Sequence, residues 1–379
     1  MAAQRTRSAE WTNLGSERGG VRRYAARRMR HLSVGIVVSV GLAGLVALGA
    51  VGIACAPAEK PPAAASRPAA PAPLGARLVT PSVRWTTILD ADHPLVGRIW
   101  NVRAARFSDE PEVLAALHGD VLLGEKHDNP DHHALQARLL RAMVDGGRKP
   151  VVAFEMFDVD DQGAIDTSRR EHPRDAASLA QAVAWEKSGW PPWEQYAPIA
   201  QVALDRDLPL VATGLPRSRM RALMKPAGTS DAGVAGSEEK IDVGVPLTAE
   251  QEASLRDELR ESHCGHLPDA RIAGMIRFQR ARDASMASAL IAAENAAHTP
   301  DGVLIAGTGH TRRDRGAGAD LASRDPSRGV VSIAFSEVEK GKNEPPAYAE
   351  RWNTTALPFD FVWFTPRATD EDPCAAFAH

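Results

Sequence analysis

Short apolar runs recur along most of the chain and predict the strands of a buried sheet. Each run is nearly all apolar, as expected for a strand that other elements cover on both faces. Segments of helical length separate the runs, and this alternation predicts an α/β fold with a mostly parallel sheet flanked by helices. The runs are residues 121–123, 151–154, 210–212, 303–306, 330–335 and 361–364.

The polar and apolar positions between these runs predict helices. One helix ends before Gly119, and a second covers residues 131–145. Thr248 opens a capping-box pattern, which begins a charged helix that runs to about residue 262. A longer helix covers residues 269–297, where large apolar side chains recur at helical intervals.

The last two helices lie between the third and fourth predicted strands and are too long for a minimal crossover. They predict a helical subdomain or lid at about residues 225–298, inserted in a single α/β domain of residues 78–379. Residues 225–246 contain few large side chains, so the first part of this insertion is expected to be a loop.

The N-terminal part of the chain has the pattern of a secretory leader, residues 1–54. Arginines precede an uncharged apolar stretch at residues 32–54, as in a signal peptide, although a stretch of this length could also span a membrane. The small residues before Cys55 resemble a bacterial lipobox, which predicts lipidation of Cys55. Residues 55–77 are rich in proline and alanine and predict a tether, so we expect a lipid-anchored protein of the bacterial cell envelope, on its periplasmic or surface face.

Further expectations come from composition and from the cysteines. Residues 1–28 are polar and arginine-rich, which favours Met29 as the true start. The formal net charge of the 379 residues is −3, and nucleic-acid binders usually carry a basic face instead. No CxxCH motif is present, so covalent haem attachment is not expected. If Cys55 is lipidated, Cys264 and Cys374 are left and could pair in an oxidising compartment.

Three predicted strands end in side chains that could carry chemistry. The first is followed by Glu125 and His127, the second ends at Glu155, and the fourth leads to His310. Ligands collect at the carboxyl ends of parallel strands, and a buried Glu155 needs a cation or a proton. His127, Glu155 and His310 could hold zinc or iron, with Glu125 accepting a proton from metal-bound water.

Simpler interpretations exist for each of these residues. Glu155 could pair with one of the many arginines, and a single Gly-x-x-His element is a weak signal. Residues 128–131 could serve only as a turn and an N-cap. His132 and His133, in the first turn of the next helix, would be surface residues or indirect donors to the site.

Other candidate residues lie outside these strand ends. Arg312 and Arg313 could hold an anionic substrate or a cofactor carboxylate, or could form a solvated basic turn. His263 lies in the segment Ser-His-Cys-Gly-His, which offers metal ligands or makes a plain turn between helices. The aromatic segment at residues 185–196 could line a pocket for a planar cofactor or could pack in the core.

Several motifs in this order resemble the ChaN family of haem-binding bacterial lipoproteins in the Tiki superfamily. They are GEKHDNPDHHALQ, AFEMF, WPPWEQYAPIAQVA, LPLVATGLPR, SHCGHLPD, RFQRARDASMA and GTGHTRRDRG. The resemblance implies haem binding and a role in haem or iron uptake, with an uptake receptor or transporter as partner. It also implies haem held through a tyrosine at the interface of a homodimer, for which Tyr196 is the best candidate because it lies within a motif.

The wider superfamily also includes metal-dependent proteases and esterases. In these enzymes paired Gly-x-x-His elements and a strand-end glutamate form the active centre, and the matching positions here are His127, His310 and Glu155. Two functions therefore follow from the resemblance. One is an envelope-anchored haem-binding lipoprotein, and the other is a metal-dependent hydrolase of peptides or esters.

Overall fold

The computed structural model describes residues 83–216, 219, 223–224, 241–372 and 374–375. The predicted leader, Cys55, the tether and most of the predicted loop lie outside these residues, so the expectations about them stay predictions. Within the described residues, no helix combines the length and the apolar character needed to cross a membrane.

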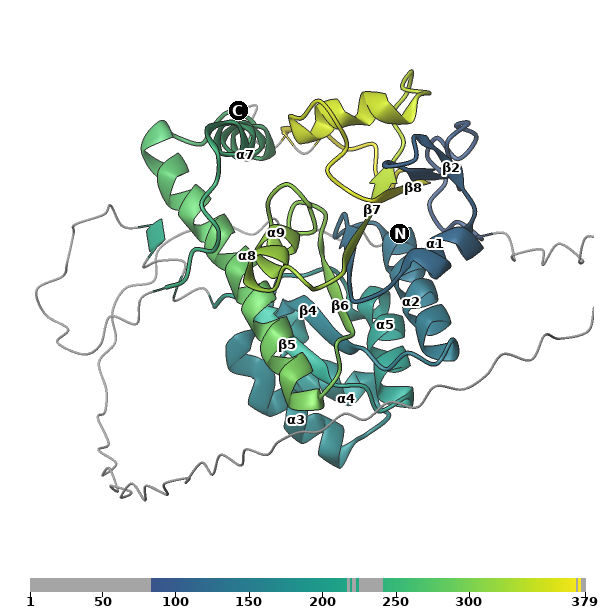
Figure 1. Cartoon of the computed structure of the whole chain (residues 1–379), viewed down its shortest axis with the longest axis vertical. Helices are drawn as coiled ribbons and strands as arrows, with labels where there is room; N and C mark the ends of the chain where they lie inside the picture. Colours follow the sequence, from purple (N-terminus) through teal and green to yellow (C-terminus); the bar gives the residue numbers. More distant parts are fainter. Residues whose placement is uncertain (1–82, 217–218, 220–222, 225–240, 373, 376–379) are drawn as a thin grey trace, which may run out of the picture. The chain divides into compact units, whose positions relative to one another are not determined.

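The described residues contain one sheet with the strand order β2-β1-β8-β7-β3-β6-β4-β5 (Figure 1). All pairs from β8 to β5 are parallel, whereas β1 pairs antiparallel with β8 and with β2. This confirms the predicted α/β fold with a mostly parallel sheet. The strands are β1 (Ile99–Asn101), β2 (Arg106–Ser108), β3 (Asp120–Glu125), β4 (Val151–Asp158), β5 (Leu210–Gly214), β6 (Gly302–Gly307), β7 (Val330–Glu337) and β8 (Phe361–Thr365).

The predicted helices are present within a residue or two of their expected ends. The Asn129 side chain caps the second of them by accepting from two backbone N–H groups, and the capping box of Thr248 with Gln251 is formed. The helices are α1 (Glu110–Ala116), α2 (Pro130–Asp145), α3 (Gln162–Glu171), α4 (Ala176–Ala182), α5 (Trp193–Asp205), α7 (Ala249–Ser262), α8 (Asp269–Ala297), α9 (Ala317–Arg324) and the 3₁₀ helices η1 (Val159–Asp161), η2 (Trp185–Lys187) and η3 (Pro345–Trp352).

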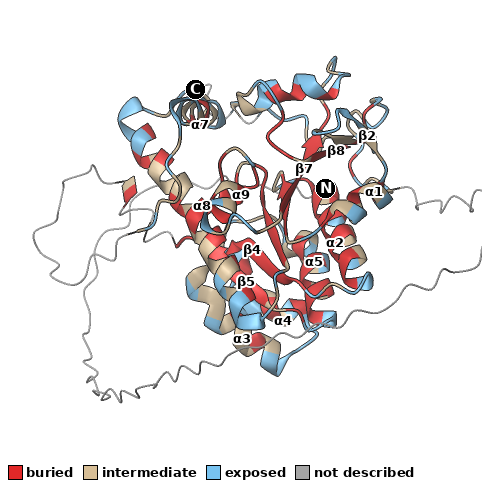
Figure 2. Cartoon of the chain, viewed as in Figure 1, coloured by how far each residue is buried: buried red, intermediate tan, exposed pale blue. Residues whose placement is uncertain are grey.

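Alternate residues of β3 enter two different hydrophobic layers because successive side chains of a strand point to opposite faces. Val121 and Leu123 pack with residues of α1, α2, α4 and α5. Leu122 packs on the other face with residues of α8 and α9. Figure 2 shows the strands and the inner sides of these helices as buried, which explains why the predicted strands are apolar at nearly every position.

The long helix α8, which lies in the predicted helical subdomain or lid, packs in two different places. Met286, Ala287 and Leu290 in its second half pack against the sheet, so this half is a wall of the α/β domain. The first half packs instead with α7 in a small separate cluster that contains Ile272 and Ile276. Only α7 and the first half of α8 therefore have the character of an inserted hairpin.

Cys264 and Cys374 form a disulfide with their Cα atoms 5.5 Å apart, a pairing that the sequence left open. Cys264 lies in the turn between α7 and α8, and Cys374 lies near the C-terminus, so the bond spans 110 positions. It joins the tip of the helical hairpin to the end of the chain.

A buried ionic cluster lies at the amino end of the central strands. Asp120 and Glu294 are 0% and 1% exposed, respectively, and Arg328 forms ion pairs with both carboxylates. Burial, together with the neighbouring Asp120, raises the pKa of Glu294 well above its ordinary value. Asp120 begins β3 and Glu125 ends it, so this cluster lies at the opposite end of that strand from the predicted site and serves the interior of the fold.

Candidate functional site

The structure brings together the predicted residues at the carboxyl ends of β3, β4 and β6. Glu125 is the last residue of β3, Glu155 lies within β4, and His310 follows β6 in a short turn. His127 leaves the end of β3 and is the most accessible of the four, with 32% of its side chain exposed. Because these strands are adjacent and parallel, their carboxyl ends place the four side chains in one cluster.

Glu125 is the acceptor for three side chains. Its Oε1 accepts from the Tyr196 hydroxyl at 2.8 Å and from His127 Nδ1 at 2.8 Å, and its Oε2 lies 2.8 Å from His133 Nδ1. Burial alone would raise the pKa of Glu125, but His133 and His127 outweigh it and hold the pKa far below the ordinary value. Glu125 is therefore a buried anion that fixes the orientation of His127.

Glu155 lies at the centre of the cluster. Its Oε2 accepts from the Gly307 backbone N–H at 2.7 Å, and its Oε1 pairs with Arg282. The same Oε1 lies 3.5 Å from His310 Nε2 and 3.8 Å from His127 Nε2. Burial would raise the pKa of Glu155, but these positive groups hold it at about 2, so the side chain is an anion at neutral pH.

His310 is held from behind by Asp283 of α8. Its Nδ1 lies 2.6 Å from Asp283 Oδ1, an arrangement that fixes the ring and directs Nε2 toward Glu155. Burial raises the pKa of Asp283, although His310 and two arginines oppose this shift. The site thus contains two carboxylate–histidine pairs, Glu125 with His127 and Asp283 with His310, whose Nε2 atoms both face Glu155. Such an arrangement can accept and donate protons.

At two positions a side chain would collide with a neighbouring segment, so glycine is required. Gly124 lies within β3, and a Cβ there would lie 3.1 Å from Thr308 Cα, in the turn after β6. A Cβ at Gly307 would lie 2.9 Å from His127 Nε2. These glycines let the two strand ends close around the cluster.

The structure gives Glu155 a cationic partner other than the expected metal. Its burial requires such a partner, and the Arg282 guanidinium pairs with its Oε1. Among the described residues, no group of three His, Cys, Asp or Glu side chains is arranged to hold a metal ion. The simpler interpretation, an arginine paired with Glu155, describes the structure.

His132 and His133 are buried, so a surface position for either of them is wrong. His133 contacts Glu125 through Nδ1, and its Nε2 lies 3.0 Å from the His127 carbonyl oxygen. These contacts fit the alternative prediction, in which this residue is an indirect donor to the site. His132 accepts from the Lys126 N–H at 2.9 Å, and burial lowers its pKa well below the ordinary value. Both rings stabilise the turn that presents His127.

Tyr196 is fully buried and donates its hydroxyl to Glu125. Burial and the Glu125 charge raise its pKa far above the ordinary value, which opposes the tyrosinate form that binds ferric haem. Tyr348 is also fully buried, and its hydroxyl accepts from Glu339 N–H and donates to the Lys342 carbonyl. Both tyrosine hydroxyls among the described residues thus form hydrogen bonds within the protein.

A groove of about 770 Å³ lies along α4, η2 and the start of α5. We call it the tryptophan groove because Trp185, Trp190 and Trp193 line it, together with two prolines. Trp185 also packs in the core, as the simpler interpretation predicted, whereas Trp190 and Trp193 are only partly buried. The His127 ring lies against Trp190 with centroids 4.8 Å apart, so the groove borders the acid–base cluster.

The remaining predicted residues lie outside this cluster. Arg312 is fully buried in ion pairs with Glu258 and Asp314, and Arg313 pairs with Asp360. His263 caps the C-terminal end of α7. The structure therefore assigns structural contacts to these three residues, and their roles in cofactor binding stay predictions.

Arg282 and Asp283 are site residues that the sequence reasoning missed. Both lie in the middle of α8, where the sequence does contain a signal. They are charged residues between Ala281 and Ala284, which are only 1% and 0% exposed. Charges on the inner side of a sheet-covering helix require partners. Their partners at positions 155 and 310 could not be assigned without the fold.

The comparisons with known proteins agree with this fold. A family model described as haem-binding uptake, Tiki superfamily, ChaN matches residues 115–321, more than half of the chain. A solved structure of haem bound cofacially to ChaN of Campylobacter jejuni has a TM-score of 0.53 and 21% identity, covering 70% of this chain and 95% of that one. At this identity the likeness shows the fold alone.

Two other solved structures are less similar. An erythromycin esterase variant, EreC, in its open conformation has a TM-score of 0.42 and 14% identity, covering 73% of this chain and 98% of that one. The type III effector HopBA1 has a TM-score of 0.39 and 11% identity, covering 67% of this chain and 91% of that one. Neither similarity is high enough to support a statement about function, and no curated protein matches the chain. The family model covers the four strands β3 to β6 and the acid–base cluster. The chain therefore belongs to the ChaN family of the Tiki superfamily, whose members are described as haem-binding uptake proteins.

Proposed function

We propose that this protein binds haem, with the porphyrin lying against the tryptophan groove. The observation that supports this most directly is a groove of about 770 Å³ lined by three tryptophans and two prolines, because cofactor sites are largely apolar and aromatic clefts of this size. Bound haem would supply an iron centre. Ligation of that iron by Tyr196 would require its hydroxyl to leave Glu125, so the groove supports the proposal better than this tyrosine does.

We further propose that the protein serves haem or iron uptake as a lipoprotein of the bacterial envelope. Lipidation of Cys55 would anchor it to a membrane, and the proline-rich tether would separate the domain from that membrane. The Cys264–Cys374 disulfide supports an oxidising compartment. A homodimer with two facing grooves would suit cofacial haem binding like that of the Campylobacter jejuni protein, and an uptake receptor or transporter would exchange haem with it.

Replacing Trp190 by alanine is expected to weaken haem binding by roughly 30-fold, because about 2 kcal/mol of aromatic contact is lost. Titration of hemin against the purified protein, followed at the Soret band, measures this change. Trp352→Ala is the matched control, since Trp352 packs against Phe359 and not in the groove. Equal affinities for the two variants would reject the groove as the haem site, and loss of the Soret shift in Tyr196→Phe would establish ligation by Tyr196.

A second candidate function is hydrolysis of an ester or peptide without a metal. The observation that favours it is the pair of carboxylate-held histidines whose Nε2 atoms lie 3.5 and 3.8 Å from one oxygen of Glu155. Burial would lower the pKa of His127, but Glu155 and Glu125 outweigh it and raise the pKa. His127 therefore suits a general acid. His310 is held through Nδ1 by Asp283, so its Nε2 is placed to serve as the general base.

The reaction proposed for this centre uses one water molecule. His310 Nε2 accepts a proton from the water as its oxygen forms a bond to the substrate carbonyl carbon. Arg282 lies beside Glu155 and can stabilise negative charge on the carbonyl oxygen. When the bond to the leaving group breaks, His127 donates the proton that the leaving oxygen or nitrogen requires.

Substituting His310 by alanine should lower kcat on an activated ester such as p-nitrophenyl acetate by about 10²–10⁴-fold, the usual contribution of a general base. His298→Ala is the control, because His298 is exposed at the end of α8. Steady-state rates of both variants and of the native protein measure the loss of kcat. The same rates in the presence of EDTA show whether turnover depends on a metal. Turnover equal in the two variants, or abolished by EDTA, would exclude this mechanism.

A further inference from the structure

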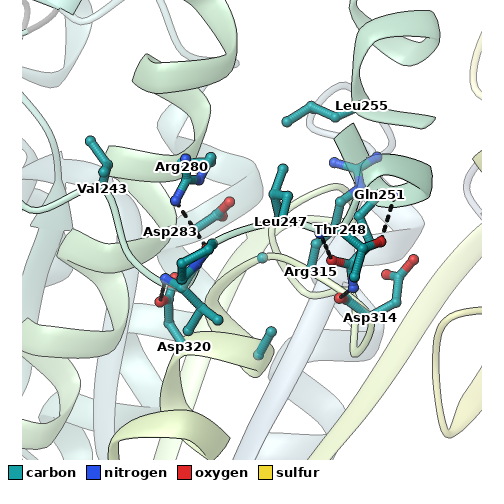
Figure 3. Close-up of a pocket in the computed structure, with 14 residues that line it drawn as sticks. Val243, Leu247, Thr248, Gln251, Leu255, Arg280, Asp283, Asp314, Arg315 and Asp320 are labelled. Atoms are coloured by element: carbon teal, nitrogen blue, oxygen red, sulfur yellow. Dashed lines mark hydrogen bonds between the residues drawn. The ribbon is translucent and has the colours of Figure 1, made fainter. Parts of the chain in front are cut away.

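A second pocket lies behind the Asp283–His310 pair (Figure 3). Its volume is about 250 Å³, and its walls come from α7, α8, α9 and the segment before α7. Because α8 and α9 cover the face of the sheet opposite to α4 and α5, this pocket and the tryptophan groove lie on different faces. The acid–base cluster is thus bordered by one cavity on each side.

Asp283 is the side chain that connects this pocket to the cluster. Its Oδ1 contacts His310 Nδ1 at 2.6 Å, and the residue also forms part of the pocket wall. Its side chain is 8% exposed. Within the part of the chain that the structure describes, His310 is its only hydrogen-bond partner, so its second carboxylate oxygen is left for water in the pocket.

The remaining walls can hold ordered water. A buried water needs two to four polar partners and a modest volume, and both are available here. Figure 3 shows polar groups on several sides of the pocket, and they are contributed by Thr248, Gln251, Arg280, Asp314 and Asp320. Aliphatic side chains such as Leu247 and Leu255 close the rest.

The charged groups around Asp283 come from every neighbouring element. His310 follows β6, Arg315 precedes α9, and Arg282 belongs to the same helix α8. Asp320 of α9 is also close enough to interact, and burial with Asp283 nearby raises the pKa of Asp320 to about 6. Arg280 is held by the carbonyl oxygens of residues 244 and 245. The pocket therefore contains two carboxyl groups that hold protons more tightly than carboxyls in water.

We propose that this pocket is a proton entrance to the cluster, separate from the ligand entrance on the tryptophan side. When His310 is an imidazolium, its Nδ1–H bond breaks as an O–H bond forms at Asp283 Oδ1. The carboxyl then releases a proton to pocket water, leaving His310 neutral with a proton on Nε2. The reverse sequence returns a proton to Nδ1. The use of this path in catalysis rests on the proposed function, but the path itself does not.

Filling the pocket tests the proposal in the intact protein. Ala319 lines it, and Ala319→Leu should slow exchange of the His310 Nδ1 proton with solvent by about tenfold, because exchange depends on access of water. NMR of protein with ¹⁵N-labelled histidine measures this rate. Ala180→Leu, which fills part of the tryptophan groove instead, should leave the rate unchanged.

Two further variants complete the test. Asp283→Asn retains the shape and the acceptor oxygen but cannot take up the proton, so it should slow the same exchange by at least about tenfold. Leu247→Phe fills the pocket from its other wall and replaces Ala319→Leu if that variant does not fold. The proposal would be overturned by an exchange rate equal to that of the native protein in folded Ala319→Leu or Leu247→Phe, or in Asp283→Asn. Neither haem nor substrate is needed for this measurement, so its failure is distinct from failure of either proposed function.

Discussion

Replacing Arg328 by methionine should lower the free energy of unfolding by about 3–5 kcal/mol, the cost of removing one partner from a buried ion pair. Arg328 lies 3.1 Å from Asp120 Oδ2 and also pairs with Glu294. Without the guanidinium, two buried carboxyl groups would face each other in a dry part of the fold. Urea-induced unfolding followed by circular dichroism measures the change.

The same cluster makes a prediction about pH. The folded-state pKa of Glu294 is raised above its ordinary value of 4.5, so its protonated form stabilises the fold fully below pH 4.5. This contribution is lost as the pH rises through the raised value. The effect of Arg328→Met should therefore be greater at alkaline than at acidic pH. Arg106→Met is the control, because the side chains of the Arg106–Glu112 pair are 57% and 35% exposed and solvent screens their attraction. Equal losses in both variants would contradict this account.

Glu125→Gln should cost about 3 kcal/mol or more, because it removes the buried charge that His127 and His133 face. Thermal or urea unfolding measures the loss. Tyr196→Phe is the matched control, since it removes only the hydrogen bond from the Tyr196 hydroxyl to Glu125, worth about 1 kcal/mol. A smaller loss for Glu125→Gln than for Tyr196→Phe would show that the carboxylate charge does not stabilise the site.

The signs of the pKa shifts around Glu125 also define a pH window. The pKa of Glu125 is lowered from 4.5, so its contribution is present above pH 4.5 and is lost as the pH falls through the lowered value. The pKa values of His127 and His133 are raised from 6.5, so their contributions are present below pH 6.5 and are lost as the pH rises through the raised values. The stabilisation from this cluster should be greatest between pH 4.5 and 6.5, and Glu125→Gln should flatten that maximum.

The central part of the fold is predictable from the sequence because its strands are buried on both faces. Their apolar runs, such as that of β3, are distinct from the helical segments between them. The short strands β1 and β2 have three residues each, and at this length they carry no usable periodicity. The parallel order of the strands is what brings positions 125, 155 and 310 together, and a rule about strand ends was enough to predict that grouping.

The chemistry of the site was harder to predict than its location. A buried Glu155 requires a positive partner, and from sequence a metal and an arginine satisfy that requirement equally well. The choice depends on how α8 lies across the sheet, which places Arg282 beside Glu155 and Asp283 beside His310. Tyr196 is a similar case, because its motif gives no indication that the side chain is directed inward to Glu125.

The disulfide between Cys264 and Cys374 has a consequence for how this protein withstands proteolysis. The helices α8 and α9 and the strands β6 to β8 lie entirely within the covalent loop that the bond closes. A single cut by a protease in any exposed connection of this loop would leave both fragments attached to each other. The fragments would separate on a denaturing gel only after a reductant is added, so the bond preserves the connectivity of three of the eight described strands after such damage.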